Sequence, residues 1–289
     1  MDARPHNQID PTNANHARYN NLSIAGITLI AGGGLLLLDQ ILHTTWLSLL
    51  ALPVVGGILL AQGIHSRQMN WYIPGSLALF FGLGVMAGFG PIFRLTTFQK
   101  IGLLLLVFSQ GWTCIALITH FRAKRDAWWA IIPAGVLAGA GATLIPTNIA
   151  WFTLVLTVGG GLGLGLLVWG TVSKTFGLII PGCLMIGAAA GTYLGWSNDP
   201  RALTPLTSTG TTLVVLGLSW VLVSVFSRAV TTGFVWWPLV PAGILVIIGY
   251  GLYIGGDPNT AANFIGNTGS VGLILMGIYL LLMRRDSQR

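Results

Sequence analysis

The stretch Phe234-Val-Trp-Trp-Pro-Leu-Val-Pro-Ala-Gly-Ile244 joins an aromatic pair, a proline beside small residues, and a long apolar run. Related stretches occur at Trp71-Tyr-Ile-Pro-Gly75, Trp128-Trp-Ala-Ile-Ile-Pro-Ala-Gly135 and Phe176-Gly-Leu-Ile-Ile-Pro-Gly182. Trp and Tyr favour the headgroup depth of a membrane, and a proline in the first helical turn removes no intrahelical hydrogen bond. We therefore interpret each copy as the start of a membrane-spanning helix. The residues that define this helix-start repeat are Trp71, Pro74, Trp128, Trp129, Pro133, Pro181, Trp236, Trp237 and Pro241.

The composition indicates a protein whose solvent is lipid. Of the 289 residues, 54% are hydrophobic and 7% are charged, whereas soluble domains carry about 25% charged residues. The mean hydropathy is +0.78. Too few polar side chains are present to cover a water-soluble globule, so we expect a polytopic membrane protein with the lipid bilayer as its first partner. No nucleic-acid partner is expected.

Long apolar runs predict an all-α fold of about ten transmembrane helices, because a spanning helix needs about 20 mostly apolar residues. The expected spans are Leu22–Leu42, Trp46–Ile64, Trp71–Phe89, Ile101–Phe121, Trp129–Ile145, Ile149–Val172, Leu178–Trp196, Thr211–Phe226, Val235–Gly255 and Phe264–Met283. They group into five tandem helical hairpins at 22–64, 71–121, 129–172, 178–226 and 235–283, within one transmembrane domain that covers 22–289. Because each hairpin contains two spans, successive copies keep the same orientation and form parallel repeats.

The basic residues predict the orientation of these spans. With the expected spans, 11 of the 14 Lys and Arg residues lie on the side of the N-terminus, and only Arg94, Lys100 and Arg201 lie on the other side. Short basic loops are held in the cytoplasm, so we expect both termini there. Residues 1–21 are polar and lack the short apolar core of a signal peptide, so they are expected to form a flexible cytoplasmic tail.

Small residues are expected to bring the helices together, since lipid provides no hydrophobic drive for helix association. We expect pairs of glycines four residues apart to pack helix against helix, either within the chain or between copies of it. Glycines four residues apart occur at Gly84/Gly88, Gly135/Gly139, Gly161/Gly165, Gly187/Gly191, Gly191/Gly195 and Gly251/Gly255.

No ionisable residue lies near the middle of an expected span, which disfavours a proton-coupled or cation-coupled carrier. The deepest polar group is Ser109-Gln110, with Thr113 one turn further along the chain. One interpretation is that these side chains form interhelical hydrogen bonds. The alternative is that they line a path for a small polar solute.

The sequence predicts no catalytic residue, no metal site and no cofactor. The five His, the seven Asp and the absence of Glu give no catalytic triad or metalloprotease motif. Cys114 and Cys183 lie in apolar runs and are interpreted as packing residues. The outer loops contain Asp199-Pro200 and Asp257-Pro258, which are typical of turns; a shared metal or ligand site is the alternative.

The first hairpin resembles the membrane module of LiaI/LiaF-like bacterial proteins. The matching residues are Ile24-Ala-Gly-Ile-Thr-Leu-Ile-Ala-Gly-Gly-Gly-Leu-Leu-Leu-Leu-Asp39, Trp46, Leu52-Pro53 and Gly56-Gly-Ile-Leu-Leu60. Trp237-Pro-Leu-Val-Pro-Ala-Gly243 is similar to the start of that module's second helix. The resemblance implies a bacterial cytoplasmic membrane and an association with envelope stress, although this chain lacks the soluble domain that LiaF-like proteins carry.

The sequence thus favours a non-enzymatic integral membrane protein. We expect an accessory or scaffold subunit of a membrane complex, or an envelope-stress component, that binds other membrane subunits or copies of itself. The alternative is an uncoupled transporter or channel for a small solute.

Overall fold

The computed structural model describes residues 26, 29–42, 47–66, 69–90, 94–123, 127–146, 150–197, 204–231, 233–255 and 258–286. The described part of the chain is helical and contains no β-strand. The expected all-α class is therefore confirmed for these residues. The tail at 1–21 and both Asp-Pro dipeptides lie wholly or partly outside them.

Helices follow one another along the described chain, and each expected span overlaps helical residues, some of them in more than one segment. Six of these segments are long and apolar enough to cross a membrane: Ser48–Ser66, Trp71–Phe89, Thr97–Phe121, Trp151–Val172, Phe176–Trp196 and Pro205–Val230. The shorter apolar helices are Leu29–Leu42, Trp128–Leu144 and Leu239–Gly255. The helical segments are α2 (Leu47–Ser66), α3 (Met69–Phe89), α4 (Thr97–Ile118), η1 (Thr119–Ala123), η2 (Trp128–Ala130), α5 (Ile131–Leu144), α6 (Trp151–Leu154), η3 (Val155–Gly159), α7 (Gly160–Val172), α8 (Phe176–Trp196), α9 (Pro205–Val230), α10 (Leu239–Gly255) and α11 (Pro258–Asp286).

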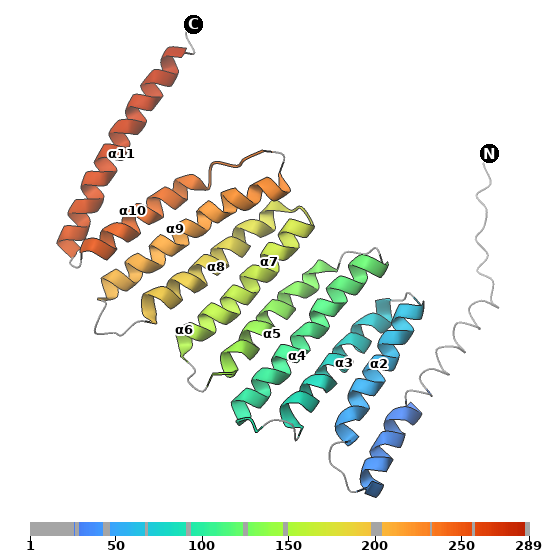
Figure 1. Ribbon diagram of the computed structural model, residues 1–289. Helices are drawn as coiled ribbons and strands as arrows, with labels where there is room; N and C mark the ends of the chain where they lie inside the picture. The colour runs from blue at the N-terminus through green and yellow to red at the C-terminus, as the bar shows by residue number, and fades with distance from the viewer. Residues whose placement is uncertain are drawn as a thin grey trace, which may run out of the picture.

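The helices from α2 to α10 lie side by side in a single row (Figure 1). Neighbours in the row are neighbours in the chain, they run antiparallel, and the extensive contacts join such consecutive helices. α6, η3 and α7 form one continuous segment between α5 and α8. The helix Leu29–Leu42 lies beside α2 at one end of the row, and α11 tilts away from α10 at the other (Figure 1).

Glycines lie where neighbouring helices approach most closely. A Cβ atom on Gly102 of α4 would lie 2.8 Å from the carbonyl oxygen of Gly141 in α5, and one on Gly141 would lie 2.7 Å from that of Gly102. Gly210 of α9 and Gly249 of α10 show the same reciprocal approach, at 2.6 and 2.7 Å. Any side chain at these positions would have to separate the helices, so glycine sets the helix spacing.

The α10–α11 contact is less extensive than the others in the row. Ala261 of α11 packs on Gly255 of α10, and Phe264 packs on Gly251. Further along α11, Gly269 has open space around its Cα atom, and so does Gly243 of α10. α11 therefore meets α10 near its own first turns and then diverges.

The helix-start prolines occupy two different depths. Pro133 and Pro241 are the third residues of α5 and α10, within the first turn as expected. Pro74 and Pro181 are the sixth residues of α3 and α8, so they lie one turn deeper and remove an intrahelical hydrogen bond. Pro53 lies inside α2, where its ring packs against Gly82 of α3.

Hydroxyl groups link several neighbouring helices. Ser76 Oγ of α3 donates to the Gly111 carbonyl of α4 at 2.7 Å, and Thr212 Oγ1 of α9 donates to the Gly191 carbonyl of α8 at 3.1 Å. The hydroxyl groups of Thr143 in α5 and Thr157 in η3 also form a hydrogen bond. Each link satisfies a polar group between apolar helices, where water is absent.

Candidate functional site

A groove of about 730 Å³ runs along one face of the row, over α5. One wall comes from α4 and the other from the η3–α7 segment, and Ile186 of α8 also lines the groove. The lining residues are Ser109, Gln110, Thr113, Ile131, Ala134, Gly135, Ala138, Gly139, Ala142, Leu156, Thr157, Gly160, Gly161, Leu164, Gly165, Val168 and Ile186.

The groove exists because α5 presents small side chains between two bulkier neighbours. Gly135 of α5 and Gly161 of α7 approach each other so closely that a Cβ on either would overlap the other's carbonyl group. Gly139 meets the backbone at Thr157 in the same way. This crossing packs α5 closely against α7, and the small residues of α5 form the floor of the groove.

The segment facing Gly139 is a π-helix, η3, which interrupts the α-helical pattern between α6 and α7. A π-helical turn inserts an extra residue and is frequent at functional sites. In this position it brings Thr157 to Thr143, where the two hydroxyl groups bond across the helices. Nothing in the local sequence distinguished this turn from ordinary helix.

The three polar residues singled out from the sequence all line this groove. Ser109 is buried, and its hydroxyl donates to the Leu106 carbonyl at 2.7 Å. Gln110 Nε2 donates to Ser109 Oγ at 3.3 Å, and Thr113 Oγ1 donates to the Ser109 carbonyl at 3.3 Å. Within the described part of the chain these bonds all stay within α4 and join no second helix.

Gln110 remains exposed in the groove wall. Its one hydrogen bond uses the amide nitrogen, and within the described part of the chain its carboxamide oxygen accepts none. Gln110 lies near the middle of the candidate span Thr97–Phe121. An amide at that depth faces hydrocarbon unless another group meets it.

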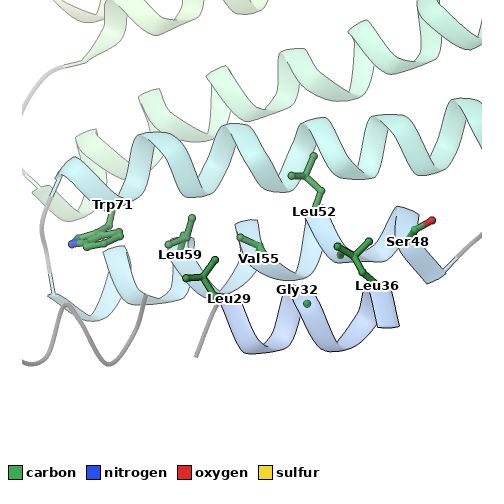
Figure 2. A pocket seen from close by; sticks show the side chains of 10 residues that line it. Leu29, Gly32, Leu36, Ser48, Leu52, Val55, Leu59 and Trp71 are labelled. Atoms are coloured by element: carbon green, nitrogen blue, oxygen red, sulfur yellow. The ribbon is translucent and has the colours of Figure 1, made fainter. Parts of the chain in front are cut away.

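A second groove, of about 690 Å³, separates the helix Leu29–Leu42 from α2. Figure 2 shows Leu29, Gly32 and Leu36 from the first helix beside Val55 and Leu59 of α2, with Ser48 at one end and Trp71 at the other. The lining residues are Leu29, Gly32, Gly33, Leu36, Ser48, Ala51, Leu52, Val55, Leu59 and Trp71. Ser48 provides the one hydroxyl group among these residues. The groove over α5 has more polar side chains for selective recognition, namely Ser109, Gln110, Thr113 and Thr157.

The aromatic residues of the helix-start repeat occupy different environments. Trp128 is buried and lies 5.0 Å from the His120 ring, centroid to centroid, whereas Trp236 is 67% exposed. Trp129 and Trp237 each contact a tryptophan of the preceding helix. The repeat therefore places aromatic rings at the starts of helices spread along the row, and its members do not converge on one site.

Within the described residues, no group of three His, Cys, Asp or Glu side chains could hold a metal ion. Cys183 is buried in a cluster with Ile179 and Val223, and Cys114 is partly buried; both are free thiols. The environment of Cys183 agrees with its interpretation as a packing residue.

Comparisons with protein-family models, curated proteins and solved structures found no significant match to this chain.

Proposed function

We propose that this protein is a non-enzymatic scaffold or accessory subunit of a membrane complex. The observation that carries the proposal is the single row of helices, whose members pack on their neighbours in the chain. Among the residues that the structure describes, such a row leaves both broad faces free for other molecules. Partner helices can pack on either face without displacing a helix of the row.

The low burial of the spans supports this function. Between 11% and 33% of the most apolar window of each candidate span is buried inside the chain. Large apolar side chains are exposed along the row, among them Phe81, Leu164 and Leu218. In a bilayer these faces contact lipid or the apolar helices of other subunits, and helix packing between subunits needs no catalytic group.

We also propose that ten spans form five parallel hairpins with both termini in the cytoplasm. The close glycine approach occurs both between α4 and α5 and between α9 and α10, where one proposed hairpin meets the next. This recurrence supports duplication of a block of two hairpins. The resemblance of the first hairpin to the LiaI/LiaF-like module favours the bacterial cytoplasmic membrane and a role in envelope stress. The row adds a reason for that role, because its open faces suit contact with a membrane-embedded sensor.

Isolation from the native membrane tests the proposed function. The full chain carrying an affinity tag would be cross-linked in membranes, extracted in mild detergent and identified with its neighbours by mass spectrometry. We expect defined membrane proteins to co-purify in fixed ratio, and an unrelated polytopic protein with the same tag serves as the control. Recovery of the chain alone would contradict a scaffold role.

The second candidate, an uncoupled transporter, is favoured by one observation: Ser109, Gln110 and Thr113 share one groove. In the described part of the chain this groove opens on the face of a row and is not enclosed by helices. A path would therefore need a second molecule to close it. Flux of small polar solutes into vesicles that contain the purified chain, lost in Gln110→Leu and kept in Gln62→Leu, would support this function.

A further inference from the structure

The carboxamide of Gln110 has a single hydrogen-bond partner, the Ser109 hydroxyl, within the described part of the chain. It lies near mid-span and is exposed. An amide whose hydrogen bonds are incomplete is unfavourable in hydrocarbon, where no water can replace them. A group at the same depth in another molecule would remove much of that cost.

The fold does not require an amide at this position. Gln110 lies two residues before Trp112 in α4. Leu218 lies two residues before Trp220 in α9, and it is 52% exposed. Each also follows the close-approach glycine of its helix by the same number of residues. The position in α9 that is equivalent to Gln110 thus holds an exposed leucine. The fold therefore does not need a polar side chain at this position.

We propose that the groove over α5 is the interface for a second copy of this chain, with Gln110 of one copy facing Gln110 of the other. The proposal rests on the proposed function, since it names the first partner of the scaffold. A carboxamide contains both a donor and an acceptor, so two of them can form a reciprocal pair of hydrogen bonds. That self-complementarity favours a second copy over an unrelated helix.

Membrane geometry leads to the same partner. Two copies with the same orientation can be related by a two-fold axis along the membrane normal. Every residue then lies at the same depth as its own counterpart, so a mid-span amide near the axis meets its own copy. In this arrangement α4 of each copy lies along the groove over α5 of the other. The small residues Ala134, Ala138 and Ala142 make room for it.

Site-directed cross-linking tests which face forms the interface. Gln110→Cys and Phe108→Cys would each be placed in the full chain with Cys114→Ala and Cys183→Ala. Phe108 is at nearly the same depth, but two residues correspond to a rotation of about 200° around the helix. We expect a thiol cross-linker in native membranes to join copies through Gln110→Cys at least tenfold more than through Phe108→Cys. Equal or reversed yields would overturn the interface.

Association in vesicles tests the amide pair. Energy transfer between labelled copies of the purified chain would be followed as the protein is diluted with lipid. We expect Gln110→Leu to weaken association about tenfold, in line with the modest strength of interhelical hydrogen bonds. Gln110→Asn should retain most of the association, and Gln62→Leu on α2 should leave it unchanged. An unchanged association constant in Gln110→Leu would overturn the pairing.

The two proposals fail separately. If the chain is monomeric in vesicles at all dilutions but co-purifies with other membrane proteins, the self-association is wrong and the scaffold function stands. If copies associate through Gln110 but no other protein is recovered from native membranes, the scaffold function is wrong and the interface stands.

Discussion

Trp220 of α9 and Trp237, just before α10, contact each other edge to face, with ring centroids 5.7 Å apart and an interplanar angle of 66°. Trp112 of α4 and Trp129, just before α5, repeat this contact at 5.9 Å and 68°. The second tryptophan follows the first at the same distance along the chain in both pairs. At these two helix starts the second tryptophan therefore has a partner on the preceding helix, and the contact stabilises the packing of the two helices.

Replacing Trp237 with Ala should destabilise the protein more than the same change at Trp236. Aromatic pairs contribute about 0.5–1.5 kcal/mol beyond their buried area, and Trp237 has such a partner, whereas Trp236 is 67% exposed. Thermal unfolding of both variants in the same detergent would give the comparison. Equal losses would mean that the edge-to-face contact adds nothing.

Glycine-to-alanine changes in α9 and α10 should alter stability in opposite directions at Gly210 and Gly243. Gly210→Ala places a methyl group against the Gly249 backbone, and we expect a loss of about 1–3 kcal/mol from overpacking. Gly243→Ala adds a methyl group in open space and should gain up to about 1 kcal/mol from helix propensity. Unfolding in detergent measures both; a loss in Gly243→Ala that matches Gly210→Ala would contradict the described crossing.

Removing the Ser76 hydroxyl should weaken the α3–α4 contact. Ser76→Ala loses the 2.7 Å hydrogen bond to the Gly111 carbonyl, which we expect to cost about 0.5–1 kcal/mol. Ser66→Ala is the matched control, because among the described residues the Ser66 hydroxyl bonds to the Gln62 carbonyl of its own helix and to no other helix. A larger effect in the control, measured by unfolding in detergent, would show that the interhelical bond is not the stronger one.

Thiol accessibility should distinguish the two edges of the row, where the helices begin and end. Lys174 lies between α7 and α8, on the edge opposite to Arg94, which precedes α4. With the cytoplasmic orientation expected from the basic residues, an impermeant reagent should label Arg94→Cys in intact cells. It should label Lys174→Cys only after permeabilisation. Labelling of both from outside would refute the alternation of the helices.

Hydropathy and charge predict where the helices lie along the chain, but not how they are arranged side by side. Lipid and the flank of a neighbouring helix are both apolar, so residues such as Leu164 and Ile179 look alike in sequence. One is exposed and the other is fully buried. The row itself, and which face of each helix is covered, therefore could not be read from the chain.

The candidate site was predicted in part. Ser109, Gln110 and Thr113 were singled out because polar groups are rare at that depth, and the structure brings them to one groove. The groove wall on the other side depends on the π-helical turn at Val155–Gly159 and on the crossing of Gly135 with Gly161. Those features arise from backbone packing between distant residues, for which a single sequence carries no distinct signal.

The single row also sets no limit on the number of helices that it contains. A ring of helices fixes its number of members, because the last must meet the first, whereas in a row each member needs only the one before it and the one after it. A hairpin can therefore be added at an end without changing the packing of the others. The width of such a protein in the membrane can grow by duplication while its internal contacts stay the same.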